Sequence, residues 1–386
     1  MSSLVLSGVQ AVLVAKSIRT FCYGYLGILL PVYLASLGMA PTGIGAAVTC
    51  TLIGSAALTW AVRRPAERLG ARATLMMLAG LSILAALLLL VSDRPWMVVL
   101  AAMAGNVAVG TGETGPFLSI EQVVIARAAA GAQRTTLLSI YNLLGYGAAA
   151  FGAVIVGLFS PRTLFAVFLV AGIAQAIVYA RLPAIAPAAR PAGATAPSTP
   201  LIRRLAALFA LDSFAGGFVL QSLIVYYLHE RYGLGLEALG QIFFVAQLIT
   251  AASLVLAARA ARRFGLLNTM VVSHLVSNVF LIAIAAAPGA WIAIALLYAR
   301  QLLSQMDVPT RQAYVMAVVD DHEREAAATT TTLWRTVAQA VSPTATGWVM
   351  ASVSMAAPFV LGGGLKIVYD VLLWVTFKDV KPKELT

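Results

Sequence analysis

The chain has 386 residues, of which 61% are hydrophobic and 11% charged, and its mean hydropathy is +0.90. Soluble domains carry roughly 25% charged residues, so this composition excludes a water-soluble globular protein and requires the bilayer as solvent. The net charge of +11 does not indicate nucleic-acid binding, because the cations lie between apolar runs. Cys22 and Cys50 lie inside apolar runs without metal-ligand spacing, so neither a metal site nor a cofactor is expected.

Twelve apolar segments follow one another along the chain, each close to the ~20 residues that a helix needs to cross a bilayer. The first run is too long for the core of a cleavable signal peptide and is predicted to be a spanning helix. The pattern predicts an all-α polytopic membrane protein with spanning helices at 10–37, 42–62, 73–92, 96–117, 135–158, 162–181, 205–228, 238–259, 268–287, 290–311, 327–351 and 356–377.

The distribution of these segments predicts two six-helix bundles of similar architecture. The N-terminal bundle covers 1–181 and the C-terminal bundle 205–386. Between them, 182–204 is rich in Pro and Ala and ends in Arg203 and Arg204, a composition typical of an extended linker.

The loops indicate the orientation in the membrane. With a cytoplasmic N-terminus, the inner loops and tail hold 18 Lys and Arg and the outer loops hold 3, namely Arg94, Arg162 and Arg231. Cytoplasmic loops are enriched in cations, so both termini, and the linker with them, are predicted to be cytoplasmic.

The two halves are related by a parallel repeat. A shift of 193 residues places Gly24 on Gly217 and Tyr33 on Tyr226. A short cationic loop is also repeated, with Arg68, Gly70 and Thr74 matched by Arg263, Gly265 and Thr269. A repeat of this period indicates two pseudo-symmetric bundles.

These features together resemble the major facilitator superfamily of secondary transporters. The family's loop after its second helix follows G-x-x-x-D-R-x-G-R-R, and the chain matches it in part with Glu67, Arg68, Gly70 and Arg72. In style the chain is closest to bacterial drug/proton-antiporter-like members, although 96–114 lacks their arginine and 141–157 lacks their Gly-Pro signature.

The resemblance implies a monomer that moves a small-molecule substrate by alternating access, coupled to protons or another ion. It also implies that the cationic inner loop acts as a cytoplasmic gate; the alternative is that its charges only set topology. The candidate gate residues are Glu67, Arg68, Gly70 and Arg72, with Arg263 and Gly265 in the second copy.

We single out eight ionisable residues inside predicted spanning helices, where each costs ~2.5–3.5 kcal/mol and usually marks a solute or ion pathway. Acids and bases are equal in number, which favours pairing over a field of one sign. The residues are Arg19, Glu113, Asp212, Arg300, Asp307, Arg335, Lys366 and Asp370.

Arg19 and Asp212 occupy matching positions of the repeat, about eight residues from the inner ends of their helices. Because counterpart helices of two-bundle transporters face one another across the cavity, we expect an ion pair between them, direct or through substrate. The pair is either a proton relay or a structural clasp. Asp212, Glu113 and Asp307 are the candidates for proton coupling.

The other charges are given separate roles. We expect Arg300 to face the cavity, and Asp307 with Arg311 to belong to an inner gate where the helix ends at Pro309; Arg311 alternatively anchors the inner loop. Lys366 and Asp370 stand four residues apart and are expected to neutralise each other. Glu121 is expected in the inner loop, and the substrate cavity is predicted to contain Arg19, Tyr23, Asn142, Asp212, Arg300, Gln301, Asp307 and Arg335.

Three functions remain open at this point. The first is proton-coupled export of a small organic solute across the cytoplasmic (inner) membrane; the second is uptake or exchange of an organic anion. The third, a membrane enzyme or sensor, is disfavoured because His229, His274 and His322 lie far apart, mostly in loops or at helix ends, and no phosphate-binding glycine loop is present.

Overall fold

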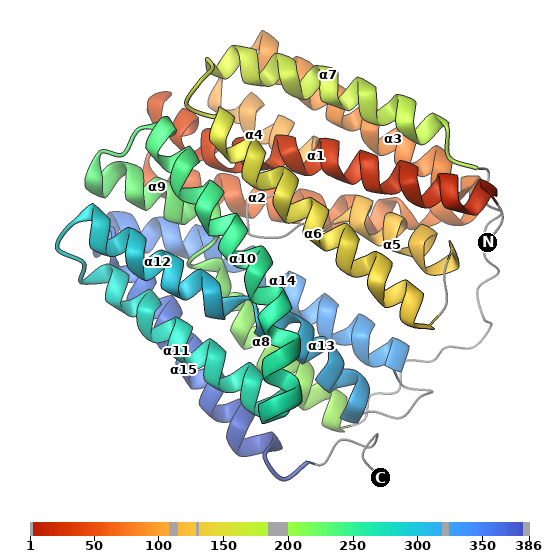
Figure 1. Ribbon diagram of the computed structural model, residues 1–386. Helices are drawn as coiled ribbons and strands as arrows, with labels where there is room; N and C mark the ends of the chain where they lie inside the picture. The colour runs from red at the N-terminus through yellow and green to blue at the C-terminus, as the bar shows by residue number, and fades with distance from the viewer. Residues whose placement is uncertain (1–2, 108–114, 129–130, 184–199, 319–323, 381–386) are drawn as a thin grey trace. The chain divides into compact units, whose positions relative to one another are not determined.

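Helices make up most of the part of the chain that the structure describes. A computed structural model describes residues 3–107, 115–128, 131–183, 200–318 and 324–380, and these residues form fifteen α-helices and no strand (Figure 1). The all-α fold class predicted from the sequence is therefore confirmed.

Each of the twelve predicted segments corresponds to one helix or to two consecutive helices. The first half contains α1 (Ser3–Ser36), α2 (Pro41–Ala61), α3 (Arg63–Val91), α4 (Pro95–Ala104), α5 (Pro116–Ala128), α6 (Gly131–Ile155) and α7 (Pro161–Ala180). The second half contains α8 (Pro200–Gly217), α9 (Gln221–Tyr232), α10 (Leu236–Phe264), α11 (Leu266–Ala285), α12 (Ala290–Ser304), α13 (Asp307–Val318), α14 (Arg324–Ser352) and α15 (Ala357–Phe377).

Three predicted helices are interrupted, and the sequence around each break explains it. After α4, Asn106 adopts a left-handed backbone with φ of 49°, and α5 begins at Pro116. The break between α8 and α9 follows two glycines, Gly216 and Gly217. Between α12 and α13 the sequence analysis was wrong: the helix does not end at Pro309. That proline lies in the first turn of α13, where no backbone N–H is needed.

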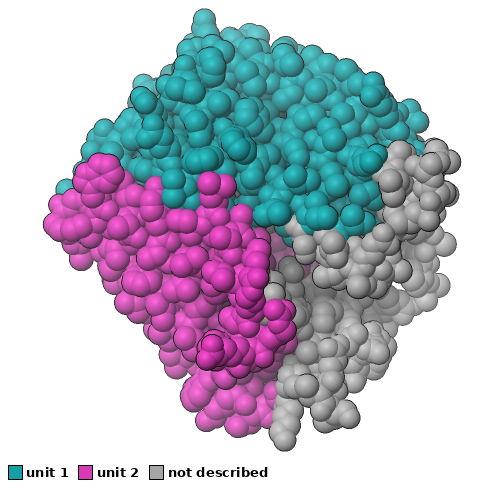
Figure 2. All heavy atoms as spheres, viewed as in Figure 1, with its two compact units in different colours: residues 1–190, 224–247 teal, residues 191–223, 248–386 magenta. Residues whose placement is uncertain are grey.

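The chain forms two compact units, coloured separately in Figure 2. Unit 1 comprises 1–190 with 224–247, and unit 2 comprises 191–223 with 248–386. Each contains its own core of buried apolar side chains, around Phe117 and Tyr179 in unit 1 and around Phe209 and Tyr369 in unit 2. The division into 1–181, 182–204 and 205–386 stays a prediction, since 224–247 groups with unit 1 and most of the linker lies outside the described residues.

Helix packing repeats between the units in the order that the sequence repeat requires. In unit 1, α1 packs on α6 and α7, and α3 packs on α4 and α7. In unit 2, α8 packs on α14 and α15, and α11 packs on α12 and α15. Corresponding helices thus have corresponding neighbours.

Matched glycines allow two of these helix pairs to approach closely. A Cβ on Gly24 of α1 would overlap the backbone of Ala149 on α6, and a Cβ on Gly217 of α8 would overlap Ser342 on α14. The shift of 193 residues that relates Gly24 to Gly217 also relates Ala149 to Ser342. Small residues are the usual means of close packing between helices in membranes.

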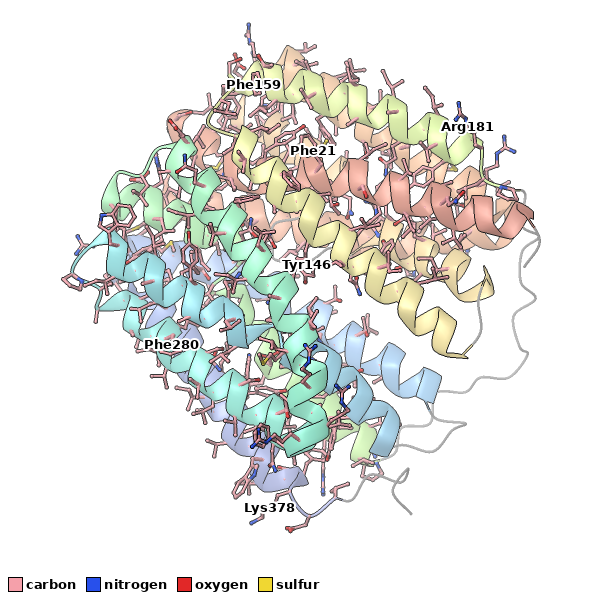
Figure 3. All side chains as sticks on the ribbon, in the orientation of Figure 1. Phe21, Tyr146, Phe159, Arg181, Phe280 and Lys378 are labelled. Atoms are coloured by element: carbon pink, nitrogen blue, oxygen red, sulfur yellow. The ribbon has the colours of Figure 1, made fainter. Side chains whose placement is uncertain are left out.

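The described helices are long and apolar enough for a polytopic membrane protein. Eight spans meet the length and hydropathy needed to cross a bilayer, and three shorter apolar helices accompany them. Cationic residues end α7 and α15, where Arg181 and Lys378 are both exposed (Figure 3).

The close packing of α1 and α6 predicts different outcomes for two glycines of one helix. A Cβ on Gly152 would overlap the backbone of Phe21, whereas Gly147 has nothing within 4 Å of the same position. Gly152→Ala is expected to destabilise the protein by about 1–3 kcal/mol, because backbone atoms must move. Gly147→Ala is expected to be neutral or slightly stabilising. Thermal unfolding in detergent measures both, and equal melting temperatures would contradict the packing.

Candidate functional site

Unit 1 contains a buried ion pair held between four helices. Arg19 on α1 forms a two-pronged salt bridge with Glu121 on α5, with Nη2–Oε2 2.7 Å and Nη1–Oε1 3.1 Å, and the two residues are 2% and 0% exposed. The Tyr179 hydroxyl on α7 accepts from Arg19 Nη1 at 2.8 Å and donates to Glu121 Oε1 at 2.5 Å. Tyr141 on α6 donates to Glu121 Oε2 at 2.6 Å. These four residues form the Arg19 cluster.

The Arg19 cluster corrects one expectation and leaves another open. Arg19 pairs with Glu121 of the same unit, whereas its expected pair with Asp212, a residue of the other unit, stays a prediction. Glu121 itself lies buried in α5 and not in the inner loop. The signal was present in the sequence, because Glu121 shares the i, i+4 spacing of Phe117 and Ile125, which are both buried.

Unit 2 contains a larger buried network around Asp212 of α8, which is 3% exposed. Lys366 Nζ on α15 lies 2.6 Å from Asp212 Oδ1, and Arg311 Nη1 on α13 lies 3.2 Å from Oδ2. Arg311 also binds Asp307 one turn earlier, at 2.5 Å, so its guanidinium bridges two carboxylates. Asp307 and Arg311 are 4% and 7% exposed, so Arg311 is a buried ion-pair partner and not a loop anchor.

Asp370 and His274 form a second pair in the same network. The His274 Nδ1 atom on α11 lies 2.7 Å from Asp370 Oδ1 on α15, and Asn278 donates to Asp370 Oδ2 at 2.9 Å. The expectation that Lys366 and Asp370 neutralise each other was wrong, because Lys366 contacts Asp212 and Asp370 contacts His274. His274 is 4% exposed within α11, so it also departs from the expected loop or helix-end position.

Two arginines at the edge of this network keep unused hydrogen-bond donors. Arg335 on α14 has a side chain 30% exposed, and its Nη1 approaches Asp212 Oδ2 only to 3.8 Å. Arg300 on α12 donates from Nη1 to Gln301 Oε1 at 2.9 Å. Within the described part of the chain, Arg335 Nη1 and Arg300 Nε have no hydrogen-bond acceptor.

The charges of this network do not balance among the described residues. We call it the Asp212 cluster, and its members are Asp212, His274, Asn278, Arg300, Asp307, Arg311, Arg335, Lys366 and Asp370. Four permanent cations face three carboxylates, and both Arg300 and Arg335 interact electrostatically with Asp212 and Asp307. With a neutral imidazole, the cluster holds one excess positive charge.

The two clusters occupy equivalent positions, and their central residues have opposite charges. Arg19 of α1 and Asp212 of α8 match in the repeat. Each lies at the centre of its cluster, in contact with residues from the other helices. Glu121, Tyr141 and Tyr179 come from α5, α6 and α7, whereas Arg311, Arg335 and Lys366 come from the corresponding α13, α14 and α15. The cation at the centre of one cluster is replaced by an anion at the centre of the other.

The remaining predicted cavity residues are dispersed. Tyr23 is buried and donates to the Gly105 carbonyl at 3.1 Å, where α4 ends. Asn142 is exposed on α6, and Gln301 is 2% exposed beside Arg300. Glu113 lies outside the described residues. Among the described residues, no group of three or more His, Cys, Asp or Glu is placed to hold a metal ion.

The repeated cationic loops share their backbone geometry. Gly70 and Gly265 have φ of 82° and 81°, a left-handed conformation that favours glycine. The Thr74 side-chain hydroxyl donates to the Gly70 carbonyl at 2.9 Å. In the second copy, the Thr269 backbone N–H donates to the Gly265 carbonyl at 3.1 Å. The side chains of Arg68, Arg72 and Arg263 are exposed, and that of Glu67 lies outside the described set. The matched glycines explain the motif, while its gating role stays a prediction.

The family model described as Major Facilitator Superfamily matches residues 12–304. An uncharacterized membrane protein of Saccharomyces cerevisiae is 23% identical over 417 aligned positions, covering 95% of this chain and 93% of the yeast protein.

Solved transporters share the fold. A human organic anion transporter has a TM-score of 0.71 at 15% identity, and the match covers 96% of this chain and 100% of the transporter chain. A nucleoside transporter has a TM-score of 0.74 at 14% identity, covering 98% and 100%. A peptide transporter has a TM-score of 0.75 at 11% identity, covering 97% of each chain.

The Arg19 cluster predicts a large stability loss when one partner is removed. Glu121→Gln leaves the Arg19 charge buried without its carboxylate and is expected to cost about 3–5 kcal/mol. Arg19→Gln combined with Glu121→Gln removes both charges and should recover part of that loss. Arg162→Gln is the control, because the Arg162–Asp93 pair is 3.5 Å long with side chains 75% and 54% exposed; its expected cost is about 0–1 kcal/mol. Thermal unfolding in detergent tests the order, and equal losses at the two sites would contradict it.

Proposed function

Because the chain belongs to the major facilitator superfamily and is a secondary transporter, we propose that its solute is a small organic anion whose movement is coupled to protons. The family and the transporter neighbours make it a transport protein and not an enzyme. Alternating access between the two units is the mechanism that we propose, as the resemblance implied.

The observation that carries the anion proposal is the excess positive charge of the Asp212 cluster. Arg300 and Arg335 retain N–H donors without acceptors among the described residues. A guanidinium presents its donors in a planar fork that fits a carboxylate or phosphate. A bound anion would therefore satisfy open donors and neutralise the excess charge at the same time.

Proton-coupled export of a small organic solute was the first expectation from the sequence, and a cationic solute exchanged for protons has less support than an anion. Such a mechanism needs a carboxylate that a proton and the solute occupy in turn. Asp212 already binds Lys366 and Arg311, and Asp307 binds Arg311. Because these carboxylates are already paired, we favour an organic anion over a cationic compound as the solute. The human organic anion transporter among the structural neighbours agrees with this order, although at 15% identity it shows the fold alone.

Topology and assembly complete the proposal. We propose that the chain lies in the cytoplasmic membrane with both termini in the cytoplasm, because Lys and Arg stand 18 to 3 in favour of the inner loops. We propose a monomer, with two six-helix bundles as the moving parts and the loops around Gly70 and Gly265 as the cytoplasmic gate.

A matched ligand set tests the sign of the substrate charge. Benzoate, benzamide and benzamidine have the same ring and nearly the same size but carry negative, zero and positive charge. Phthalate and phenyl phosphate extend the anions. The anions are expected to raise the melting temperature of the purified protein, because a ligand that binds only the folded state stabilises it. Stabilisation by benzamidine alone, or by none of the three anions, would refute the anion proposal.

Substitution of the two arginines tests the site. Arg335→Gln and Arg300→Gln are each expected to weaken anion binding by roughly tenfold to a hundredfold, the loss of a charge-assisted hydrogen bond. Arg335→Lys should keep part of the affinity, since it retains the charge but loses the fork. Arg259→Gln, which removes an exposed cation of α10, is the control and should bind as the wild type does. Isothermal titration with the anion that stabilises most measures all four, and unchanged affinity in both glutamine variants would exclude this site.

A further inference from the structure

The imidazole of His274 lies between two buried carboxylates that belong to different helices. Its Nδ1 is 2.7 Å from Asp370 Oδ1 on α15, and its Nε2 is 3.6 Å from Asp212 Oδ1 on α8. The side chains of His274, Asp212 and Asp370 are only 5%, 5% and 1% exposed. No role was assigned to this histidine by the sequence pattern, and the ion-pair network alone does not require one.

His274 is the ionisable partner within hydrogen-bond distance of Asp370 among the described residues, and Lys366 acts on Asp370 from farther away. The hydrogen bonds of Asp370 come from His274 and from the neutral amide of Asn278. Among the described residues, no lysine or arginine lies within ion-pair distance of Asp370. A carboxylate buried in this way is costly without a cation, and an imidazolium supplies one.

The Nε2 side of the His274 ring connects the His274–Asp370 pair to Asp212. Lys366 Nζ lies 3.4 Å from His274 Nε2 and 2.6 Å from Asp212 Oδ1. When the imidazole is neutral, Nδ1–H donates to Asp370 and Nε2 accepts from the Lys366 ammonium. When it is charged, Nε2–H repels Lys366 and attracts Asp212. A proton on His274 therefore competes with Lys366 for Asp212.

The remaining arginines of the cluster interact with Asp212, which lies next to His274. The imidazole itself also meets the Tyr369 ring of α15 edge-on, with ring centroids 5.8 Å apart. The helices α12 and α13 also pack on α11, and they contribute Arg300 and the Asp307–Arg311 pair to the cluster. Arg335 on α14 joins at Asp212 Oδ2. These neighbours make the cluster positive before any proton is added, so an extra proton is held more easily once an anion is bound.

We infer that the His274–Asp370 pair is the proton-binding site of the transporter, and that a proton on this pair and an organic anion at Arg300 and Arg335 strengthen each other's binding. The inference rests on the proposed anion function. Linkage requires the two effects to be equal, so the proton raises the affinity for the anion by the same factor as the anion raises that for the proton. Proton and anion then cross the membrane together.

The proton step involves no covalent chemistry on the solute. One proton is taken from water on the side of uptake and is bound at Nε2 of His274, whose Nδ1–H stays directed at Asp370. After the cluster is exposed to the other side, the same proton returns to water and the ring is again neutral.

Benzoate binding measured across pH tests the inference, with phthalate in its place if phthalate is the better ligand. In the wild type, affinity should fall as pH rises and the linked proton is lost, by up to about tenfold per pH unit for one linked proton. His274→Gln and Asp370→Asn should bind the anion with a flat pH profile near the weaker, high-pH affinity. A structural role alone would lower stability without flattening the profile.

The controls repeat each chemical change outside the cluster. His229→Gln alters a histidine of α9 whose Nδ1 contacts the Leu234 carbonyl, and Glu230→Gln alters an exposed acid of the same helix. Both should keep the wild-type pH profile. A second readout is proton uptake on anion binding in weakly buffered solution, expected to approach one per anion in the wild type and to vanish in His274→Gln.

The two proposals fail in different ways. Anion binding that is independent of pH in the wild type, or equally dependent in His274→Gln, overturns the His274 inference and leaves the anion function standing. Absence of anion binding to the wild type at every pH overturns the proposed function and the inference with it. If the two variants do not fold, wild-type binding that is independent of pH, or anion binding without proton uptake, still overturns the inference.

Discussion

A charge inside a bilayer is tolerated only when the protein compensates it, and each unit does so around one residue of its first long helix. In unit 1, Arg19 binds the Glu121 carboxylate and the Tyr179 hydroxyl, and Tyr141 donates to the same carboxylate. Asp212 in unit 2 gathers several cations, of which Arg335 is held only loosely. The first arrangement fixes four helices together, whereas the second retains donors for a further acceptor. The difference between a structural clasp and a binding site is thus one of saturation.

The close approach of neighbouring helices determines which side chains reach these centres. Gly24 lies five residues after Arg19, and Gly217 lies five residues after Asp212. At these glycines α1 approaches α6 and α8 approaches α14. Tyr141 on α6 and Arg335 on α14 reach the two clusters from equivalent helices.

Much of the fold was predictable from the sequence because its signals are local. Apolar length determines the spanning segments, and the matched glycines of the cationic loops determine their turns. The partners of the buried charges were not predictable in this way, since pairing depends on how each helix is rotated and how deep each residue lies. Lys366 and Asp370 share a helix one turn apart, yet they reach different neighbours. Glu121 was recoverable, because its spacing from Phe117 places it on the buried face of α5.

The single excess cation of the Asp212 cluster has a consequence for how voltage acts on the cycle. A membrane potential does about 2.3 kcal/mol of work per elementary charge per 100 mV. If one proton and one monovalent anion bind together, as we propose, they add no net charge to the cluster, so its empty and loaded forms respond equally to the potential and concentration gradients alone drive transport. A dianion bound with one proton would make the loaded form less positive than the empty form. Each complete transport cycle would then move net charge across the membrane and produce an electric current.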